Sequence, residues 1–305
     1  MFNPPSLIAA EVFCSVPERY RKRDQSAEWL RVQKRGATAH SFLEGPAFDR
    51  AGNLYVTDIP YGRVFRISPA GDFELVAEYD GEPNGLKVHR DGRIFIADHK
   101  HGIMLLDPAS GAVVPYLDRP RLERFKGVND LFFAPNGDLY FTDQGQSGLQ
   151  DPSGRVYRYS AQGQLSCLMD NIPSPNGIVL APDGGSLLIA VTRANSVWRA
   201  PLLADGGVSK VAAFLNLSGG FGPDGLALDQ AGGLAVCHPG LGSVWLFDAD
   251  GELLARIRSQ TGKVITNCAF GGPQRQWLYM TEADSGLVLR ARMPAPGIDL
   301  LEGQP

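Results

Sequence analysis

The sequence predicts an all-β protein, a six-bladed β-propeller, and two observations carry this prediction. A motif of two short strands around a tight turn recurs six times along the 305 residues. Successive copies begin 40, 45, 47, 48 and 43 residues apart, and a strand-rich period near this length is typical of propeller blades. Every copy opens on a side chain that carries oxygen. These opening residues are Glu44, Asn84, Asn129, Asn176, Asp224 and Asn267.

The third copy shows why the motif forms a hairpin. Two short apolar runs, Leu131–Ala134 and Leu139–Thr142, flank the residues Pro-Asn-Gly-Asp. Proline fixes φ, and Asn-Gly supplies the positive φ of a tight turn, so the chain reverses there. The polar alternation within these runs is weak, as expected for inner strands that neighbouring blades cover on both faces.

Two further strands complete most copies, with hairpin turns rich in Gly and Asp between them. Third strands are expected at Arg63–Ile67, Gly102–Leu106, Arg155–Tyr159, Ser196–Ala200, Ser243–Phe247 and Gly286–Arg290. Fourth, outermost strands are expected at Glu74–Glu78, Val113–Leu117, Leu165–Met169, Lys210–Phe214 and Leu253–Arg258. The sixth copy has no evident fourth strand before the chain ends.

The segment before the first copy is expected to close the ring. We interpret residues 1–43 as an N-terminal extension and 44–305 as the propeller, together one domain. Propellers often close by letting a strand from one terminus complete the blade begun by the other, and Leu7–Phe13 is the candidate strand. Pro17–Arg35 mixes charges with Trp29, Leu30 and Val32 at loosely helical spacing.

Composition excludes several classes of partner. The chain is 44% hydrophobic and 20% charged with a net charge of −4, and it has no basic run outside Arg19–Arg23, so nucleic acid is not an expected partner. No apolar stretch of about 18 residues occurs, and the first residues lack a basic segment, so we expect a cytoplasmic protein that does not enter membranes. The four cysteines lie far apart and form no CxxC pair, which favours reduced thiols. They are Cys14, Cys167, Cys237 and Cys268.

The repeat geometry predicts a ring of oxygen atoms in a central channel. If each opening residue starts the innermost strand, all six opening side chains point into that channel. The second strand of each copy runs back to the same end and finishes there at a second set of positions: Asp58, Asp98, Asp143, Val191 or Thr192, His238 and Glu282. Carboxylates gathered this closely require a compensating cation.

The types of side chain select the ion. Carboxylate and amide oxygens without a His/Cys cluster suit a hard divalent cation, Ca²⁺ first, with Mg²⁺, Mn²⁺ or Zn²⁺ as alternatives. The ring of opening residues carries two formal negative charges, Glu44 and Asp224, which would balance one divalent ion.

Structural interpretations of the same residues remain open at this point. Asn-Gly and Asp-Gly also occur as plain turn residues, although Glu44 and Asn129 do not fit a standard turn of that kind. Asp58, Asp98 and Asp143 are equally explained as strand ends whose carboxylates bind loop amides.

Other polar and aromatic residues near the expected mouth have two interpretations each. His99 and His101 could ligate a transition metal or lie in an exposed loop, and His238 could face the channel or not. The long loop of residues 144–154 is either a lid or a plain surface loop. Three aromatic residues flank the opening motifs and could line a pocket or pack between blades: Tyr61, Phe125 and Phe221.

These motifs, in this order, resemble the gluconolactonase/regucalcin (senescence-marker) family of six-bladed propellers, which is also similar to the calcium-dependent phosphotriesterases. The residues that carry the resemblance are Glu44-Gly45-Pro46, Val128-Asn129-Asp130, Pro175-Asn176-Gly177, residues 181–184, residues 223–227 and residues 267–272. The resemblance spans the chain from about Ser41. It implies a divalent metal held by Glu44, Asn176 and Asp224, with Asn129 beside it.

One departure bears on the substrate. Sugar lactonases of this family often carry an Arg two residues before the Asn that corresponds to Asn129, and this sequence has Gly127 there, beside Lys126. The departure points away from an aldonolactone and leaves the metal site and lactone chemistry in place.

The resulting hypothesis is a metal-dependent hydrolase that opens a small-molecule lactone or related ester. The metal would stabilise the oxyanion as it forms, while Asn129 and Asn176 orient the substrate. Asp224 would accept a proton from the attacking water, with Asp143 or Asp130 as alternative bases. Asn84 and Asn267 complete the surrounding polar shell. Two alternative functions are a phosphotriester hydrolase on the same metal site and a non-enzymatic calcium-binding scaffold.

Overall fold

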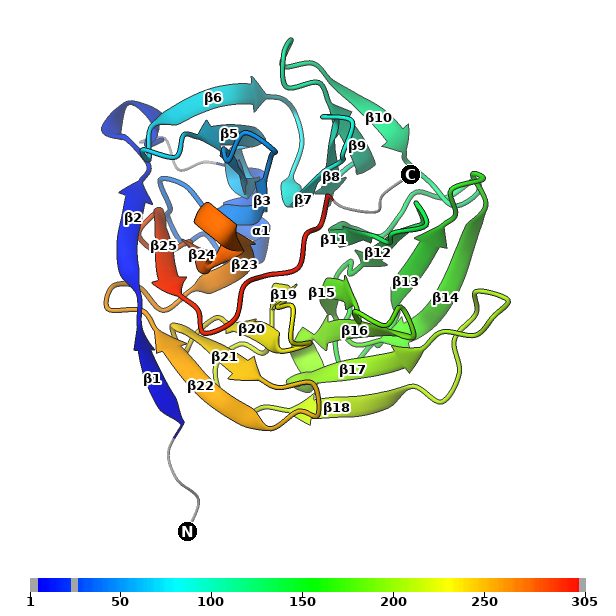
Figure 1. Ribbon diagram of the computed structural model, residues 1–305. Coiled ribbons are helices and arrows are strands. Elements are labelled where there is room, and N and C mark those ends of the chain that lie inside the picture. Colours follow the sequence, from blue (N-terminus) through cyan, green and yellow to red (C-terminus); the bar gives the residue numbers. More distant parts are fainter. Residues whose placement is uncertain (1–4, 23–26, 302–305) are drawn as a thin grey trace.

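Six sheets form a closed ring around a central channel in the computed structural model, which describes residues 5–22 and 27–301 (Figure 1). Each sheet is one blade, and its strands follow one another outward from the channel with antiparallel pairing. The inner strands surround the centre of the ring in Figure 1. The prediction of an all-β, six-bladed propeller is confirmed.

Blades one to three contain four strands each, in chain order from the channel outward. Blade one consists of β3 (Leu43–Phe48), β4 (Leu54–Asp58), β5 (Arg63–Ile67) and β6 (Phe73–Glu78). Blade two consists of β7 (Pro83–Val88), β8 (Ile94–Asp98), β9 (Gly102–Leu106) and β10 (Val113–Leu117). Blade three consists of β11 (Val128–Phe133), β12 (Leu139–Asp143), β13 (Gly154–Tyr159) and β14 (Leu165–Ile172).

The remaining blades follow the same plan. Blade four consists of β15 (Pro175–Leu180), β16 (Ser186–Val191), β17 (Ser196–Pro201) and β18 (Ala212–Asn216). Blade five begins with β19 (Leu226–Leu228), β20 (Leu234–His238), β21 (Ser243–Phe247) and β22 (Leu253–Arg258). Blade six begins with β23 (Ile265–Gly271), β24 (Trp277–Glu282) and β25 (Leu287–Arg292).

The outer strand of blade four begins later than the sequence predicts. The expected strand was Lys210–Phe214, and the observed strand is β18, Ala212–Asn216. Lys210 has φ of 51°, in the left-handed region, so the backbone there is not extended. The other third and fourth strands lie at or within a few residues of their predicted positions.

Two strands from the N-terminal segment close the ring, where the sequence predicted a single strand at Leu7–Phe13. β1 (Ser6–Ala9) pairs in parallel with β22, so blade five gains a fifth strand. β2 (Glu11–Ser15) pairs antiparallel with β25 and supplies the missing fourth strand of blade six. The chain passes from the edge of one blade to the edge of the next at Ala10, and this step splits the predicted strand. Figure 1 shows both strands, in blue, at the outside of the ring.

The helices are short. The longest is α1 (Glu28–Gln33), within the stretch where the sequence showed loosely helical spacing. The 3₁₀ turns are η1 (Glu18–Tyr20), η2 (Ile59–Tyr61), η3 (Thr192–Ala194) and η4 (Pro273–Arg275). No helix within 5–22 and 27–301 has the length and apolar character needed to cross a membrane.

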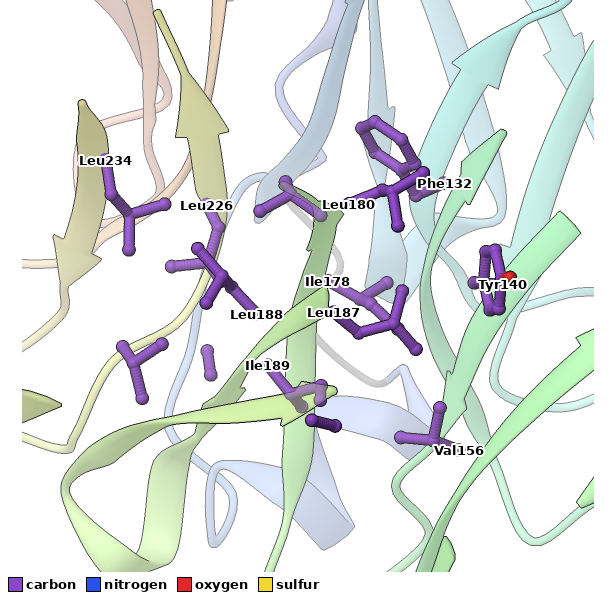
Figure 2. Close-up of a cluster of buried hydrophobic side chains, with 14 of the residues drawn as sticks. Phe132, Tyr140, Val156, Ile178, Leu180, Leu187, Leu188, Ile189, Leu226 and Leu234 are labelled. Carbon is purple, nitrogen blue, oxygen red and sulfur yellow. The ribbon is translucent and has the colours of Figure 1, made fainter. Parts of the chain in front are cut away.

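The core consists of apolar layers between neighbouring blades. Figure 2 shows one layer, in which side chains from blades three, four and five interlock, among them Phe132, Ile178 and Leu226. Ile189 is fully buried there. A completely buried Leu or Ile contributes roughly 1.5–3 kcal/mol relative to exposure, so these layers fix the angles between blades and hold the inner strands in place.

The C-terminal segment crosses one end of the channel. After β25 the chain runs over the middle of the ring, as the red segment in Figure 1 shows. It is tied down by backbone hydrogen bonds from Ile298 to Leu228 and from Gly297 to Arg275. This end lies beyond the last residues of the inner strands, opposite the end at which the opening residues stand.

Candidate functional site

The opening residue of each repeat lies where the pairing of the inner strand is interrupted. The register between the first and second strands shifts directly after the opening residue in blade one, and it shifts across the opening residue in blades two, three, four and six. In blade five the pairing starts only at Leu226, two residues after Asp224. An interrupted ladder re-aims a side chain, and this lets residues on the inner strands project into the channel.

Glycines bring the inner strands of adjacent blades into contact at this level. The residue after the opening position is Gly45, Gly85, Gly177 or Gly225 in four blades. A Cβ on Gly45 would overlap the backbone carbonyl of Asn84, and one on Gly225 would overlap the Asn267 side chain. The channel is therefore narrow at the site. In the two remaining blades this position is Asp130 and Cys268, on opposite sides of the ring.

Three polar side chains from blades one, three and six meet in the channel. The Asn267 amide Nδ2 donates to Glu44 Oε2 at 2.9 Å and to Asp130 Oδ2 at 3.4 Å. Glu44 Oε2 also accepts the backbone N–H of Gly45. All three side chains are buried. Asn267 thus separates two carboxylates that would otherwise repel each other directly.

Lys87 compensates one of these carboxylates. Its Nζ lies 3.4 Å from Asp130 Oδ1, and its side chain is 15% exposed. The same Asp130 oxygen accepts the backbone N–H of Leu131 at 2.8 Å. With Asp130 and Lys87 paired, the carboxyl groups of Glu44 and Asp224 have no cationic side chain at ion-pair distance among the described residues.

Asn129 and Asn176 each present an amide oxygen without a hydrogen-bond partner among the described residues. The Asn129 Nδ2 donates to Gln144 Oε1 at 3.0 Å, and Gln144 Nε2 donates in turn to Ser174 Oγ at 2.8 Å. These bonds fix the orientation of the Asn129 amide. The Asn176 amide lowers the pKa of the Asp224 carboxyl, against the larger effects that raise it. Buried amide oxygens are normally satisfied, so these two orphaned oxygens are exceptions, and they are of the donor type that a hard cation binds.

The electrostatics of the carboxylates agree with this geometry. Burial and the neighbouring Asp130 charge raise the pKa of Glu44 to about 7, against the smaller opposing effects of the Asn267 and Gly45 hydrogen bonds. Burial, Glu44 and Asp130 raise the pKa of Asp224 well above its ordinary value. The protein alone therefore disfavours the ionised form of both groups.

Asn84 is the opening residue of blade two and is half-buried. Its backbone carbonyl accepts the Thr57 hydroxyl at 2.7 Å. Thr142 donates in the same way to the Asn176 carbonyl at 2.7 Å, and Thr192 to the Pro223 carbonyl at 2.7 Å. These bonds join each second strand to the next blade at the level of the site. Sequence reasoning missed the role of these threonines, although the recurring Thr-Asp at the strand ends was a signal for the first two.

The carboxylates that end the second strands hold loops. Asp58 Oδ1 accepts the backbone N–H of Phe42 at 2.7 Å, and its Oδ2 pairs with the buried Arg63, whose Nε lies 2.9 Å away. Asp143 Oδ1 accepts the N–H of Gly127 at 2.7 Å. The loop-amide interpretation accounts for one oxygen of each residue. The other oxygen of Asp58 pairs with Arg63, and the buried Oδ2 of Asp143 has no hydrogen-bond partner among the described residues.

Asp98 and Glu282 act in the same way. Asp98 accepts the Tyr79 hydroxyl at 2.7 Å and the N–H of Glu82 at 3.0 Å on one oxygen, and two further backbone N–H groups on the other. Glu282 accepts the N–H groups of Asp284 and Ser285, both at 3.0 Å.

The histidines do not converge on a metal. His101 Nε2 contacts the backbone oxygen of Asp80 at 2.5 Å, whereas the His99 ring packs against Gly127. His238 Nδ1 accepts the Trp245 indole N–H at 3.0 Å, so its Nε2 donates to the Gly219 carbonyl at 3.0 Å. Within 5–22 and 27–301 no three His, Cys, Asp or Glu side chains gather as a metal-binding group. The candidate donor set instead combines carboxylates with amides.

The long loop contributes one residue to the site, whereas Phe125 and Tyr61 make structural contacts. The loop of residues 144–154 contributes Gln144 to the site, and Ser147 fastens it through an Oγ bond to the Gln144 carbonyl at 2.6 Å. Phe125 packs among core aromatic rings, and the Tyr61 hydroxyl donates to the Ala39 carbonyl at 2.6 Å. Phe221 is 55% exposed.

The space that a side chain at residue 127 would occupy is taken by the His99 ring, which follows the second strand of blade two. The φ of Gly127 is 151°, and a Cβ added there would overlap the His99 imidazole. A side chain larger than hydrogen is therefore excluded unless His99 moves. Burial lowers the pKa of His99 below its usual value, so this ring is neutral near pH 7.

The fold and this site define a class: a six-bladed propeller whose central channel gathers carboxylate and amide oxygens at one end. Residues 42–284 match the family model described as "SMP-30/Gluconolactonase/LRE-like region". The chain belongs to this family. The match covers every opening residue of the repeats, so the resemblance predicted from the motifs is confirmed.

Curated relatives and solved structures agree with this assignment. A gluconolactonase of Zymomonas mobilis is 30% identical over 281 residues, which span 82% of this chain and 78% of the relative. A lactonase drp35 of Staphylococcus saprophyticus is 28% identical over 90% of this chain and 80% of its own length. The crystal structure of a calcium-binding protein, regucalcin, from Agrobacterium tumefaciens shares the fold, with a TM-score of 0.75 and 24% identity over 96% of this chain and 97% of that one.

Proposed function

We propose that this protein is a divalent-metal-dependent hydrolase that opens the ring of a lactone. The observation that carries the proposal is the set of four donors at one end of the channel: the Glu44 and Asp224 carboxylates and the orphaned amide oxygens of Asn129 and Asn176. The names of the relatives, a gluconolactonase and a lactonase, support the same reaction class.

The donor set fits a hard cation. Two carboxylates and two neutral oxygens provide a charge of −2, and Lys87 already compensates the third carboxylate, Asp130. Oxygen donors without thiolate or imidazole are typical of Ca²⁺ and Mg²⁺ sites. Ca²⁺ fits best, because it accepts asparagine amide oxygens together with carboxylates in a flexible geometry. We propose that Glu44, Asn176, Asp224 and Asn129 hold the ion. When bound, it would polarise the carbonyl of the substrate as a Lewis acid.

The side chains around the ion would perform the remaining steps. A water oxygen bonds to the lactone carbonyl carbon, and its proton passes to a carboxylate. The bond between the carbonyl carbon and the ring oxygen then breaks, and the ring oxygen takes up the proton, giving a hydroxy acid. The net reaction consumes one water and no other reactant.

We propose Asp224 as the proton acceptor, because its carboxylate belongs to the same donor set as the amide oxygens that would orient the substrate. The alternatives have other partners: Asp130 contacts Lys87 and Asn267, and Asp143 holds the Gly127 amide.

The decisive experiment measures lactone hydrolysis by acid release. Protein stripped with EDTA and protein reloaded with Ca²⁺, Mg²⁺, Mn²⁺ or Zn²⁺ are compared on several sugar and aliphatic lactones. Activity that disappears on stripping and returns with one ion is the expected result. Asp183→Asn, in an exposed turn far from the channel, serves as a matched carboxylate control and should retain full activity. If every loaded form is inert on every lactone, the proposal fails.

A further inference from the structure

The segment of residues 27–42, which we call the mouth cap, lies at the site end of the channel. Its backbone is fixed by a bond from Ile59 N–H to the Phe42 carbonyl at 3.2 Å and from the Tyr61 hydroxyl to the Ala39 carbonyl at 2.6 Å. Leu30 of α1 is 1% exposed. Trp29 and Phe42 pack in one apolar cluster with residues of blades one and six. The mouth cap is therefore a packed part of the protein.

Lys34, at the C-terminal end of α1, carries an unpaired ammonium group. Its Nζ lies 4.1 Å from the centroid of the Phe42 ring and 5.5 Å from that of Trp29. The rings hold the cation in place by cation–π attraction. The lysine is half-buried, and no carboxylate within 5–22 and 27–301 lies at ion-pair distance from it. A half-buried cation without a counter-ion is unfavourable unless a ligand supplies one.

The packing of Phe42 places Lys34 at the channel mouth, because the Lys34 Nζ lies over the Phe42 ring. Phe42 packs with Ile59, Val264 and Ala283, and these residues directly adjoin the ends of β4 and β24 and the start of β23 at the site end. Burial lowers the pKa of Lys34, the carboxylates of Asp224 and Asp284 oppose this effect, and Arg193 in blade four adds to it. Asp284 is exposed and binds the Lys263 N–H at 3.0 Å.

Arg193 is the second cation at this entrance. It lies in η3, directly after the second strand of blade four, and is exposed. Its backbone N–H bonds the Pro173 carbonyl, and no described side chain pairs with its guanidinium. Two like charges facing one entrance repel each other, and an anion between them would relieve that repulsion.

We propose that Lys34 and Arg193 bind an anionic group on the substrate, so that the preferred lactones carry a carboxylate or phosphate outside the ring. This inference rests on the proposed lactonase function and adds the substrate class. The lactone ring enters toward Glu44 and Asp224, and its anionic substituent remains at the mouth. Lys34 and Arg193 are positioning residues in this arrangement.

The test uses two γ-lactones with the same ring, neutral glucono-γ-lactone and glucaro-γ-lactone, in which a carboxylate replaces the terminal hydroxymethyl group. A phosphorylated gluconolactone separates phosphate from carboxylate recognition. Wild type should have a higher kcat/KM on an anionic lactone than on the neutral one. Lys34→Met and Arg193→Gln should each reduce the anionic-to-neutral ratio at least about tenfold, as expected for a lost charge-assisted contact. Lys34→Arg should restore much of the ratio.

Lys22→Met is the matched control, because Lys22 is another cation of the N-terminal segment but pairs with Glu78 at 2.9 Å. It should leave the ratio unchanged. Because Arg193 is exposed, Arg193→Gln should remove its positive charge without disturbing the fold. It therefore tests the role of charge even if Lys34→Met disturbs the mouth cap. An unchanged ratio in both variants, with the neutral lactone still hydrolysed, would overturn the inference and leave the lactonase proposal standing.

A binding measurement separates the two proposals if no lactone is hydrolysed. Calorimetric titration with glucarate dianion should show binding that weakens at least about tenfold in Lys34→Met and Arg193→Gln and falls with added salt. Uncharged glucitol is the negative control. Equal affinity of wild type and both variants for glucarate would refute the anion site independently of turnover.

Discussion

The charge balance in the channel depends on single residues. Glu44 and Asp224 together carry the two charges that a divalent ion would neutralise, while Lys87 pairs with Asp130. Two carboxylates held close together in a narrow, glycine-lined channel are unfavourable for the protein alone. The same arrangement therefore lowers the stability of the metal-free protein and raises its affinity for a cation.

Glu44→Gln tests this balance. The variant keeps an oxygen that can accept the Gly45 and Asn267 hydrogen bonds but removes one negative charge. We expect calcium affinity to fall at least about 100-fold, since a lost charge contact costs several kcal/mol. The metal-free variant should be more stable than the metal-free wild type at pH 8. Isothermal titration and denaturant unfolding measure the two effects, and a variant destabilised at pH 8 would contradict the charge argument.

The pH dependence of the stripped protein has a defined sign. The pKa of Glu44 is raised to about 7 from an ordinary value of 4.5, so the folded protein binds its proton more tightly than the unfolded chain. The contribution of Glu44 to stability is therefore fully present below pH 4.5 and is lost as pH rises to about 7, a change of roughly 3 kcal/mol. Urea unfolding of EDTA-treated protein between pH 5 and 8 should show this loss. Glu44→Gln should flatten the profile.

At the scale of elements, the loop after β12 positions a site residue. Gln144 joins the Asn129 amide to Ser174, and Ser147 fastens the loop. This arrangement holds the Asn129 amide by its nitrogen and leaves its buried oxygen unpartnered among the described residues.

Gln144→Ala should free the Asn129 amide to rotate. We expect kcat/KM on a good lactone substrate to fall roughly tenfold, because one orienting hydrogen bond is lost. The thermal midpoint should change little. Gln150→Ala, in the same loop, is the control and should behave as wild type. If Gln144→Ala lowers activity only by lowering stability, the positioning role is wrong.

The two N-terminal strands have unequal roles. β2 completes blade six, and Phe13 and Cys14 pack against a core cluster, whereas β1 adds a fifth strand at an outer edge where Leu7 is 73% exposed. An unpaired β25 would expose a sheet edge and apolar surface.

Deletions separate these roles. Removal of residues 1–9 should lower the thermal midpoint by a few degrees, and removal of residues 1–15 should lower it by at least about 10 °C, because a 1 kcal/mol loss corresponds to only a few degrees. Calorimetry of both deletions measures the difference. Equal midpoints for the two truncated proteins would show that β2 does not close the ring.

At the scale of the whole molecule, one site joins several blades. The proposed ligands come from blades one, three, four and five, so a bound ion would cross-link strands that are distant in sequence. A ligand that binds only the folded state stabilises it according to its concentration.

Added calcium should therefore raise the thermal midpoint of the entire domain. At a concentration about 100 times the Kd the gain is about 2.7 kcal/mol, and EDTA should reverse it. Differential scanning calorimetry with and without calcium measures the shift. Asp183→Asn should respond as wild type does, whereas Asp224→Asn should show no shift. A wild-type midpoint that is independent of every divalent ion would argue against a metal in the channel.

The propeller architecture and the positions of the opening residues could be predicted from the repeat pattern. Six repeats of alternating turn and apolar-strand residues at near-constant spacing allow one closed arrangement, so blade number, strand order and the opening residues could be predicted. Glu44, Asn176 and Asp224 were recognisable because each opens a repeat and lies in a specific local motif. The position of the strand that closes blade six was predicted. The break at Ala10 was not predicted, because it arises from pairing of the two halves with different blades.

Which polar groups meet depends on contacts between blades that are distant in sequence. The pairing of Lys87 with Asp130 joins blades two and three, and the Asn267 bond to Glu44 joins residues 223 apart in sequence. Lys34 lies outside the repeats and packs over Phe42, next to residues of blades one and six. The strand-ending carboxylates looked equivalent to the ring residues in sequence, and the fold turned them toward loop amides. A repeat pattern specifies which face of a strand a residue occupies. The partner it meets there depends on packing between blades, which no local pattern encodes.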